Sequence, residues 1–139
     1  MSARLTAEQV YARMARLPFF VVLMRPTADY RPDTETGREL MRAHLQWQLE
    51  LEEEGRLLAA GPLNPGEPVS HDHPIVNAGG MYVIAAATRE EAERIAAREP
   101  FAVAGWRTHV VCPWLLNEGV VRDRAAAVVD RFGPVPERR

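Results

Sequence analysis

Four short stretches of the chain have the apolar pattern of β-strands. Residues 19–24 are a continuous apolar run between two prolines, which is typical of a buried central strand. Further strands are expected over residues 57–63, 81–87 and 106–115, and a segment rich in Pro and Gly separates the second strand from the third. The pattern therefore predicts a sheet of four strands.

Two helices between these strands have clear start and stop signals. Thr36 and Glu39 have the spacing of a capping box, and Gly55 follows the last residue of that helix. A second helix is expected to begin at Thr88 and to end before Pro100, because proline cannot continue a helix. The order of elements is therefore strand, helix, strand, strand, helix, strand.

Each end of the chain is predicted to carry an extra helix. Residues 6–17 begin with Thr6 and Gln9 at capping-box spacing, and residues 122–132 have an apolar stripe at helical spacing. We expect the C-terminal helix to dock on a partner chain or on the open end of a barrel formed by the sheets.

The order of elements is that of the ferredoxin-like α+β fold, βαββαβ, in which one four-stranded antiparallel sheet carries both helices on one face. A single domain over residues 1–139 is expected, with its core at about 19–116. The other sheet face would then be a large exposed apolar surface, which soluble proteins seldom tolerate. Two such sheets packed across a two-fold axis would cover it, so the sequence predicts a homodimer.

Composition narrows the possible functions. The net charge of -2 argues against nucleic-acid binding, and the absence of lysine excludes a Schiff-base mechanism. With no leader and no apolar stretch of membrane-spanning length, a cytoplasmic protein without membrane contact is expected. The single cysteine, Cys112, lies in an apolar run and is predicted to be a buried, unreactive thiol. The chain has no phosphate loop or dinucleotide fingerprint, and no cofactor is expected.

His44 is the first candidate for chemistry. Leu40, Trp47 and Leu51 share its arc of the predicted helix, so His44 points toward the core. A histidine in this position is either a general acid or base or a core residue satisfied by one hydrogen bond. The residues alone leave both interpretations open.

An ordered set of short motifs resembles the YciI-like (YCII-related) family. The motifs are His44 with its apolar neighbours, EGRLLAAGP at residues 54–62, Gly79-Gly80, EEA at 90–92, EPF at 99–101 and Gly105. The resemblance runs from about Phe19 to Trp114. It implies a dimeric α/β barrel and a relationship to small enzymes such as muconolactone isomerase and a dehydrochlorinase of the same family. Most members have no established activity.

The resemblance also implies a site. The family is thought to pair a helix histidine with an acidic residue just before a Pro-Phe or Pro-Tyr turn, and here these residues are His44 and Glu99. They are the predicted catalytic pair. The family usually has Asp at the second position, and the extra methylene of Glu99 moves the carboxylate by about 1.5 Å, enough to change a hydrogen bond.

Five residues are predicted to contact a small-molecule ligand: Trp47, Gly61, Phe101, Trp106 and Arg107. The three aromatic residues form either a pocket wall or plain core. Arg107 shares one face of the last strand with His109. That face either lines the pocket, where Arg107 would favour an anionic substrate, or is a solvent-facing edge.

Histidines at residues 71 and 73, with Asp72 between them, have a spacing seen in zinc or nickel sites, which Asp72 or His109 would complete. The chain offers no fixed second pair of ligands, so a solvated loop is the preferred interpretation and no metal is predicted.

Taken together, the residues and the resemblance predict a cofactor-independent enzyme. Its chemistry would be acid–base isomerisation or elimination by a histidine, on a small anionic or aromatic molecule. The alternative is a non-catalytic, small-molecule-binding or accessory dimer. A third possibility, an oxygenase-like relative, would need a haem or a substrate that activates oxygen itself.

Overall fold

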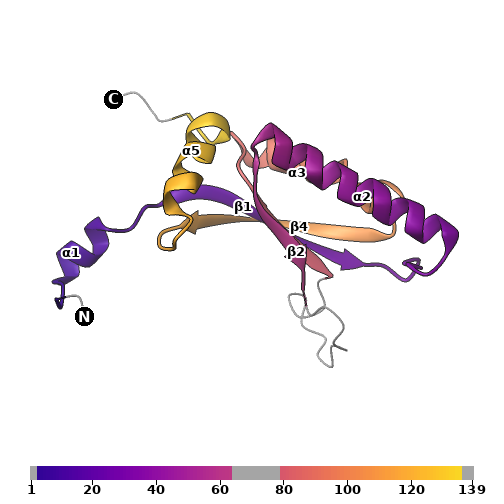
Figure 1. Cartoon of the computed structure of the whole chain (residues 1–139), viewed down its shortest axis with the longest axis horizontal. Coiled ribbons are helices and arrows are strands. Elements are labelled where there is room, and N and C mark those ends of the chain that lie inside the picture. Colours follow the sequence, from indigo (N-terminus) through magenta and orange to yellow (C-terminus); the bar gives the residue numbers. More distant parts are fainter. Residues whose placement is uncertain (1–2, 64–78, 136–139) are drawn as a thin grey trace.

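A computed structural model describes residues 3–63 and 79–135 of the chain. Within these residues, β1 (Leu17–Pro26), β2 (Leu57–Pro62), β3 (Gly80–Ile84) and β4 (Arg107–Leu116) form an antiparallel sheet with the order β2-β3-β1-β4. Helices α2 (Glu35–Glu54) and α3 (Arg89–Ala97) cover one face of the sheet (Figure 1). The predicted ferredoxin-like α+β fold is confirmed.

Alternate residues of β1 divide the core into two layers. Phe20, Val22 and Met24 point toward α2 and α3, where they pack with Tyr82 and neighbouring apolar side chains. Phe19 lies on the opposite face in a second cluster. Strand alternation produces this division because successive side chains point to opposite faces. The central strand is thus apolar on both faces, as its continuous apolar run predicts.

The N-terminal helix is shorter than the sequence predicts. Helix α1 covers Ala7–Ala12 instead of residues 6–17, although the Thr6 capping box is present. Leu17 instead begins β1 and pairs with Leu116 of β4. Arg16, which has a positive φ of 52°, turns the chain into this pairing. Tertiary pairing with β4 therefore ends the helical segment early.

Helix α2 begins two residues before the predicted start. Its cap is Thr34, not Thr36, and the Thr34 hydroxyl accepts a hydrogen bond from the Gly37 N–H. Its end is as predicted, because Gly55 adopts the left-handed conformation at φ 94° that glycine tolerates best. These two caps define the ends of α2, and Leu51 and Trp47 pack it on the sheet.

Helix α5 (Arg122–Phe132) has the bounds that the sequence predicts, but its docking surface differs from the expectation. It packs on the chain's own sheet, on the face opposite α2 and α3, where Ala125, Val128 and Phe132 join the cluster around Phe19. The apolar side of α5 therefore covers part of the sheet face that a partner chain was expected to cover.

The rest of that sheet face keeps exposed apolar side chains. Val110 is 47% and Trp114 42% exposed, and both lie on the face away from α2 and α3. Cys112, between them, is partly exposed and not buried as predicted. In the described ranges, no helix is long and apolar enough to span a bilayer.

Candidate functional site

His44 and Glu99 meet between two elements that are far apart in sequence. His44 lies in the middle of α2, and Glu99 precedes α4 (Pro100–Val103), a short helix that follows α3. The imidazole Nδ1 is 2.7 Å from the Glu99 Oε1, and both residues are buried, at 5% and 2% exposure. The structure thus brings together the pair that the family resemblance implies.

Glu99 is also the N-cap of α4. Its Oε1 accepts a hydrogen bond from the Phe101 N–H at 3.1 Å, and its Oε2 accepts one from the Ala102 N–H at 2.8 Å. Pro100 suits the first helical position because its missing N–H needs no partner there. The longer glutamate side chain therefore contacts the helix end and His44 at once, and the departure from aspartate leaves the pair intact.

The charge state of Glu99 follows from these contacts. Burial by itself would raise its pKa, but the hydrogen bonds from His44 and from the Phe101 and Ala102 backbone outweigh burial, so the pKa of Glu99 lies below its usual value of 4.5. Near neutral pH, Glu99 is therefore an ionised carboxylate.

The ionised state of Glu99 fixes the tautomer of His44. A carboxylate only accepts hydrogen bonds, so the Nδ1 of His44 must carry the proton that it donates to Oε1. In the neutral imidazole the lone pair then lies on Nε2. This nitrogen has no hydrogen-bond partner among the described residues, and His44 lines a cavity.

The cavity beside His44 has a volume of about 250 Å³. Its apolar wall is formed by Met24, Met41 and Leu45, and its polar side chains are His44, Gln48 and Arg107. Gly61, Pro62, Gly79 and Gly80, from β2 and the start of β3, complete the lining. The site therefore combines a base, a cation and an amide in a mostly apolar enclosure.

Arg107 is buried in this wall and does not form a solvent-facing edge. It is 9% exposed, and its guanidinium carbon lies 4.2 Å from the centroid of the Phe101 ring and 5.2 Å from that of Tyr30. Strand pairing explains the position: Arg107 opposes Pro26 on the sheet face that α2 covers. The face of β4 that carries Arg107 therefore lines a cavity at this residue and is not a solvent-facing edge there.

The predicted ligand contacts divide into two groups. Gly61 and Arg107 line the cavity. Trp47, Phe101 and Trp106 do not line it, so the predicted aromatic wall is wrong for this cavity. Trp47 packs edge-on against Tyr82, and Phe101 is fully buried beside the His44 ring. These rings support the site from behind.

The apolar wall was not predicted as a binding surface. Met41 and Gln48 lie three and four residues from His44, and Leu45 lies four residues after Met41, so these side chains border one side of α2. Helical spacing was thus a usable signal for these three. Met24 and Tyr30 had no such signal, because only the strand pairing and the loop after β1 bring them near Arg107.

Tyr82 lies beneath the site and takes no charge. Burial, followed by the nearby charges of Glu99 and Glu93, raises the pKa of its hydroxyl far above the usual value. It remains a neutral phenol whose ring packs against Trp47, with a ring-centroid distance of 5.5 Å.

Metal binding finds no support in residues 3–63 and 79–135, where no group of three or more His, Cys, Asp or Glu side chains converges. His109, the proposed additional ligand, is instead 3.5 Å from the Glu93 carboxylate. His71, Asp72 and His73 lie outside the described residues.

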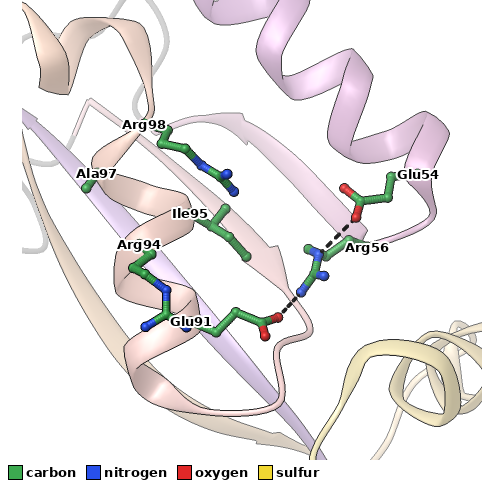
Figure 2. A pocket seen from close by; sticks show the side chains of 7 residues that line it. All are labelled: Glu54, Arg56, Glu91, Arg94, Ile95, Ala97 and Arg98. Atoms are coloured by element: carbon green, nitrogen blue, oxygen red, sulfur yellow. Dashed lines mark hydrogen bonds and ion pairs between the residues drawn. The ribbon is translucent and has the colours of Figure 1, made fainter.

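A second, larger hollow lies between the C-terminal end of α2 and α3 (Figure 2). This groove has a volume of about 510 Å³ and includes Glu54, Arg56, Glu91, Arg94 and Arg98. Figure 2 shows Arg56 joined to both glutamates. Glu54 is ten residues beyond His44 on α2, or about 15 Å along the helix axis, so the groove does not share the His44 chemistry.

The fold and this site define an α+β protein with a ferredoxin-like sheet and a buried histidine–carboxylate pair at a small cavity. The model of the YCII-related domain matches residues 19–115, so the chain belongs to the YCII-related family. Among solved structures, it is similar to 5-chloro-2-hydroxyhydroquinone dehydrochlorinase from Burkholderia phenoliruptrix AC1100 in complex with 2,5-dihydroxybenzoquinone. The identity is 18% over 69% of this chain and 92% of that chain, with a TM-score of 0.49. A comparison with curated proteins gives no match.

Proposed function

We propose that the protein is a cofactor-independent enzyme in which His44 moves a proton on a small anionic or aromatic molecule bound in the adjacent cavity. One observation carries the proposal: the Nδ1 of His44 is 2.7 Å from a buried carboxylate, and the same side chain lines the cavity. A histidine that only fills a core needs no cavity beside it.

The geometry supports a specific division of roles. Glu99 holds the Nδ1 proton and orients the ring, and the Nε2 lone pair accepts a proton from an acidic C–H bond of the substrate. The electron pair of that bond passes into the adjacent carbonyl system as an enolate. Isomerisation follows when the imidazolium returns the proton to another carbon. Elimination follows when the enolate electrons form a carbon–carbon double bond, a leaving group departs with the electron pair of its own bond, and the imidazolium releases its proton to that group or to water.

The runner-up is a non-catalytic binding or accessory protein that uses the same cavity. Both functions need a ligand in the cavity, but only the enzyme needs a proton to move. Hydrogen exchange at carbon therefore separates them.

The experiment is to incubate the protein in D₂O with a panel of enolisable acids that have a short chain or one ring, and to follow the C–H signals by NMR. The wild type should replace the acidic proton by deuterium, and His44→Gln should slow this exchange by about 100-fold or more. His109→Gln is the matched control, because His109 lies outside the cavity lining. Equal exchange rates in wild type and His44→Gln would contradict the enzyme.

We also propose that the working unit is a homodimer that packs on the sheet face not covered by α2 and α3. The exposed side chains of Val110 and Trp114 on that face support it. Light scattering at micromolar concentration should give about twice the chain mass, and Val110→Glu should give a monomer because it buries a charge at the contact. A monomeric wild type would contradict the dimer.

A further inference from the structure

Arg107 is a buried cation without a described counter-charge. It is 9% exposed, and none of the ion pairs among the described residues includes it. Its terminal nitrogens contact the Met24 sulfur at 3.8 Å and the Tyr30 hydroxyl at 3.3 Å, both weak partners for a full charge. Its Nε is buried and has no hydrogen-bond partner in the part of the chain that the structure describes. A buried charge normally has an anionic partner, because losing hydration is unfavourable.

Aromatic rings hold the guanidinium in place without neutralising it. Phe101 and Tyr30 present their faces to it at 4.2 and 5.2 Å, as in cation–π contacts. Phe101 also lies 5.7 Å from the His44 ring, measured between centroids. The same ring therefore supports both Arg107 and His44, and one small ligand can contact both.

We propose that Arg107 is the anion-binding residue of this cavity and that the ligand is a monocarboxylate with one ring or a short chain. The proposal deepens the proposed function, since it specifies the substrate class for the site where His44 acts. The carboxylate would pair with the guanidinium, and the reacting carbon would face His44 Nε2.

The choice of a carboxylate rests on the polar groups that the cavity supplies. The planar fork of Arg matches two carboxylate oxygens, and such bidentate pairs are strong. A phosphate dianion would need further donors, but Arg107 is the only arginine among the described lining residues. Gln48 adds one amide, and the remaining side chains at the wall are mostly apolar. One negative charge therefore fits, and two do not.

The size of the ligand follows from the volume. A cavity of about 250 Å³ is smaller than the roughly 300–1,000 Å³ of sites for drug-sized ligands. A single substituted ring fills such a space. Met24, Met41 and Leu45 offer apolar contact to the body of the ligand while Arg107 binds its charged end.

The experiment measures binding of three probes by calorimetry at pH 7: sodium benzoate, benzamide and inorganic phosphate. Benzamide has the shape of benzoate without its charge. The wild type should bind benzoate at least about tenfold more tightly than benzamide, because a charge-assisted pair is stronger than a neutral hydrogen bond. Phosphate should not compete. Equal affinity for benzoate and benzamide would overturn the proposal.

Two substitutions locate the anion. Arg107→Met should abolish the preference for benzoate, because it weakens benzoate binding much more than benzamide binding. Arg98→Met removes the same charge from the exposed groove of Figure 2 and should leave both affinities unchanged. A loss of benzoate binding in Arg98→Met, with binding retained in Arg107→Met, would place the anion in the groove and overturn the proposal.

A measurement on the wild type keeps the test valid if Arg107→Met does not fold. In protein labelled with ¹⁵N at arginine, the Nε–H signal of Arg107 should shift on titration with benzoate and not with benzamide. No shift at saturating benzoate would overturn the proposal. Binding of benzoate requires no proton to move, so failure of anion binding in calorimetry and failure of proton transfer in D₂O are separate results.

Discussion

The site at His44 and the groove between α2 and α3 both combine glutamate and arginine, but in opposite arrangements. In the groove, Arg56 lies between Glu54 and Glu91, and these glutamates are 47% and 31% exposed at the side chain. At the cavity, the lining residue His44 pairs with Glu99 behind it, and Arg107 has no carboxylate partner among the described residues. The groove is the larger hollow, but of the two it is the smaller cavity that is lined by a histidine paired with a buried carboxylate.

The difference shows what a hollow needs in order to act on a ligand. Arg56 is 15% exposed at its side chain, but two glutamates that reach water pair with it, so its charge is already matched without a ligand. Buried groups lose their hydration, and an unmatched one favours a ligand that restores it. Burial, not volume, therefore distinguishes the two sites. Substitutions at the two sites should change the free energy of unfolding by different amounts.

The largest expected difference concerns stability. Glu99→Ala should lower the free energy of unfolding by about 3 kcal/mol, because it removes a buried partner of His44 and leaves two backbone N–H groups without an acceptor. Glu91→Ala in the groove should lower it by about 1 kcal/mol or less. Urea unfolding of both variants measures the difference, and equal losses would remove the distinction between the sites.

Arg107 should respond in the opposite direction. Arg107→Met replaces an unmatched buried cation with an apolar side chain of similar length. The free energy of unfolding should therefore stay equal or rise, and the rise should not exceed about 2 kcal/mol. The same substitution at exposed Arg98 should change it by less than about 0.5 kcal/mol. Thermal melting without ligand checks both. A large loss in Arg107→Met would mean that Arg107 serves the fold.

The loss of folding stability at low pH should depend on Glu99. Because the folded-state pKa of this carboxylate lies below 4.5, its contribution is fully present above the unfolded value and is lost as pH falls through the folded value. Glu99→Gln should therefore flatten the fall in stability below about pH 4.5. Exposed Glu53→Gln is the control and should retain the wild-type slope in urea unfolding at several pH values.

The smallest expected effect is that of salt. Raising sodium chloride to about 1 M should reduce the stability difference between wild type and Glu91→Ala by a few tenths of a kcal/mol, because ions screen exposed pairs. The difference between wild type and Glu99→Ala should not change, since that carboxylate is 2% exposed. Equal salt dependence of the two differences would show that ions reach both sites alike.

Local signals in the sequence were sufficient for much of the fold. Three features depend only on residues that are neighbours in the sequence, so the sequence predicts them directly. They are the apolar run of β1, the helix cap at Thr88 and the helix end at Gly55. The cap of α2 was misassigned by two residues because two threonines compete, and only the bond from the Gly37 N–H to the Thr34 hydroxyl decides between them.

The site was predictable only in part. Helical spacing put His44 on the inner side of α2, and the family resemblance added Glu99, since 55 residues separate them and no local rule links them. The predicted aromatic wall was wrong for this cavity because composition cannot tell a pocket wall from the core behind it. Phe101 is an example: its ring is buried under Arg107 and His44.

By itself, the sequence determined the order of elements, the core side of α2 and the shared face of Arg107 and His109, because periodicity in a helix or strand fixes which residues lie together. Only the tertiary structure decided which face is covered and by what. Pairing with β1 turned Arg107 toward α2, pairing of Leu17 with Leu116 shortened α1, and α5 packed on its own sheet. Each outcome depends on contacts between segments that are distant in the sequence. The free energy of such contacts cannot be predicted from a local sequence pattern.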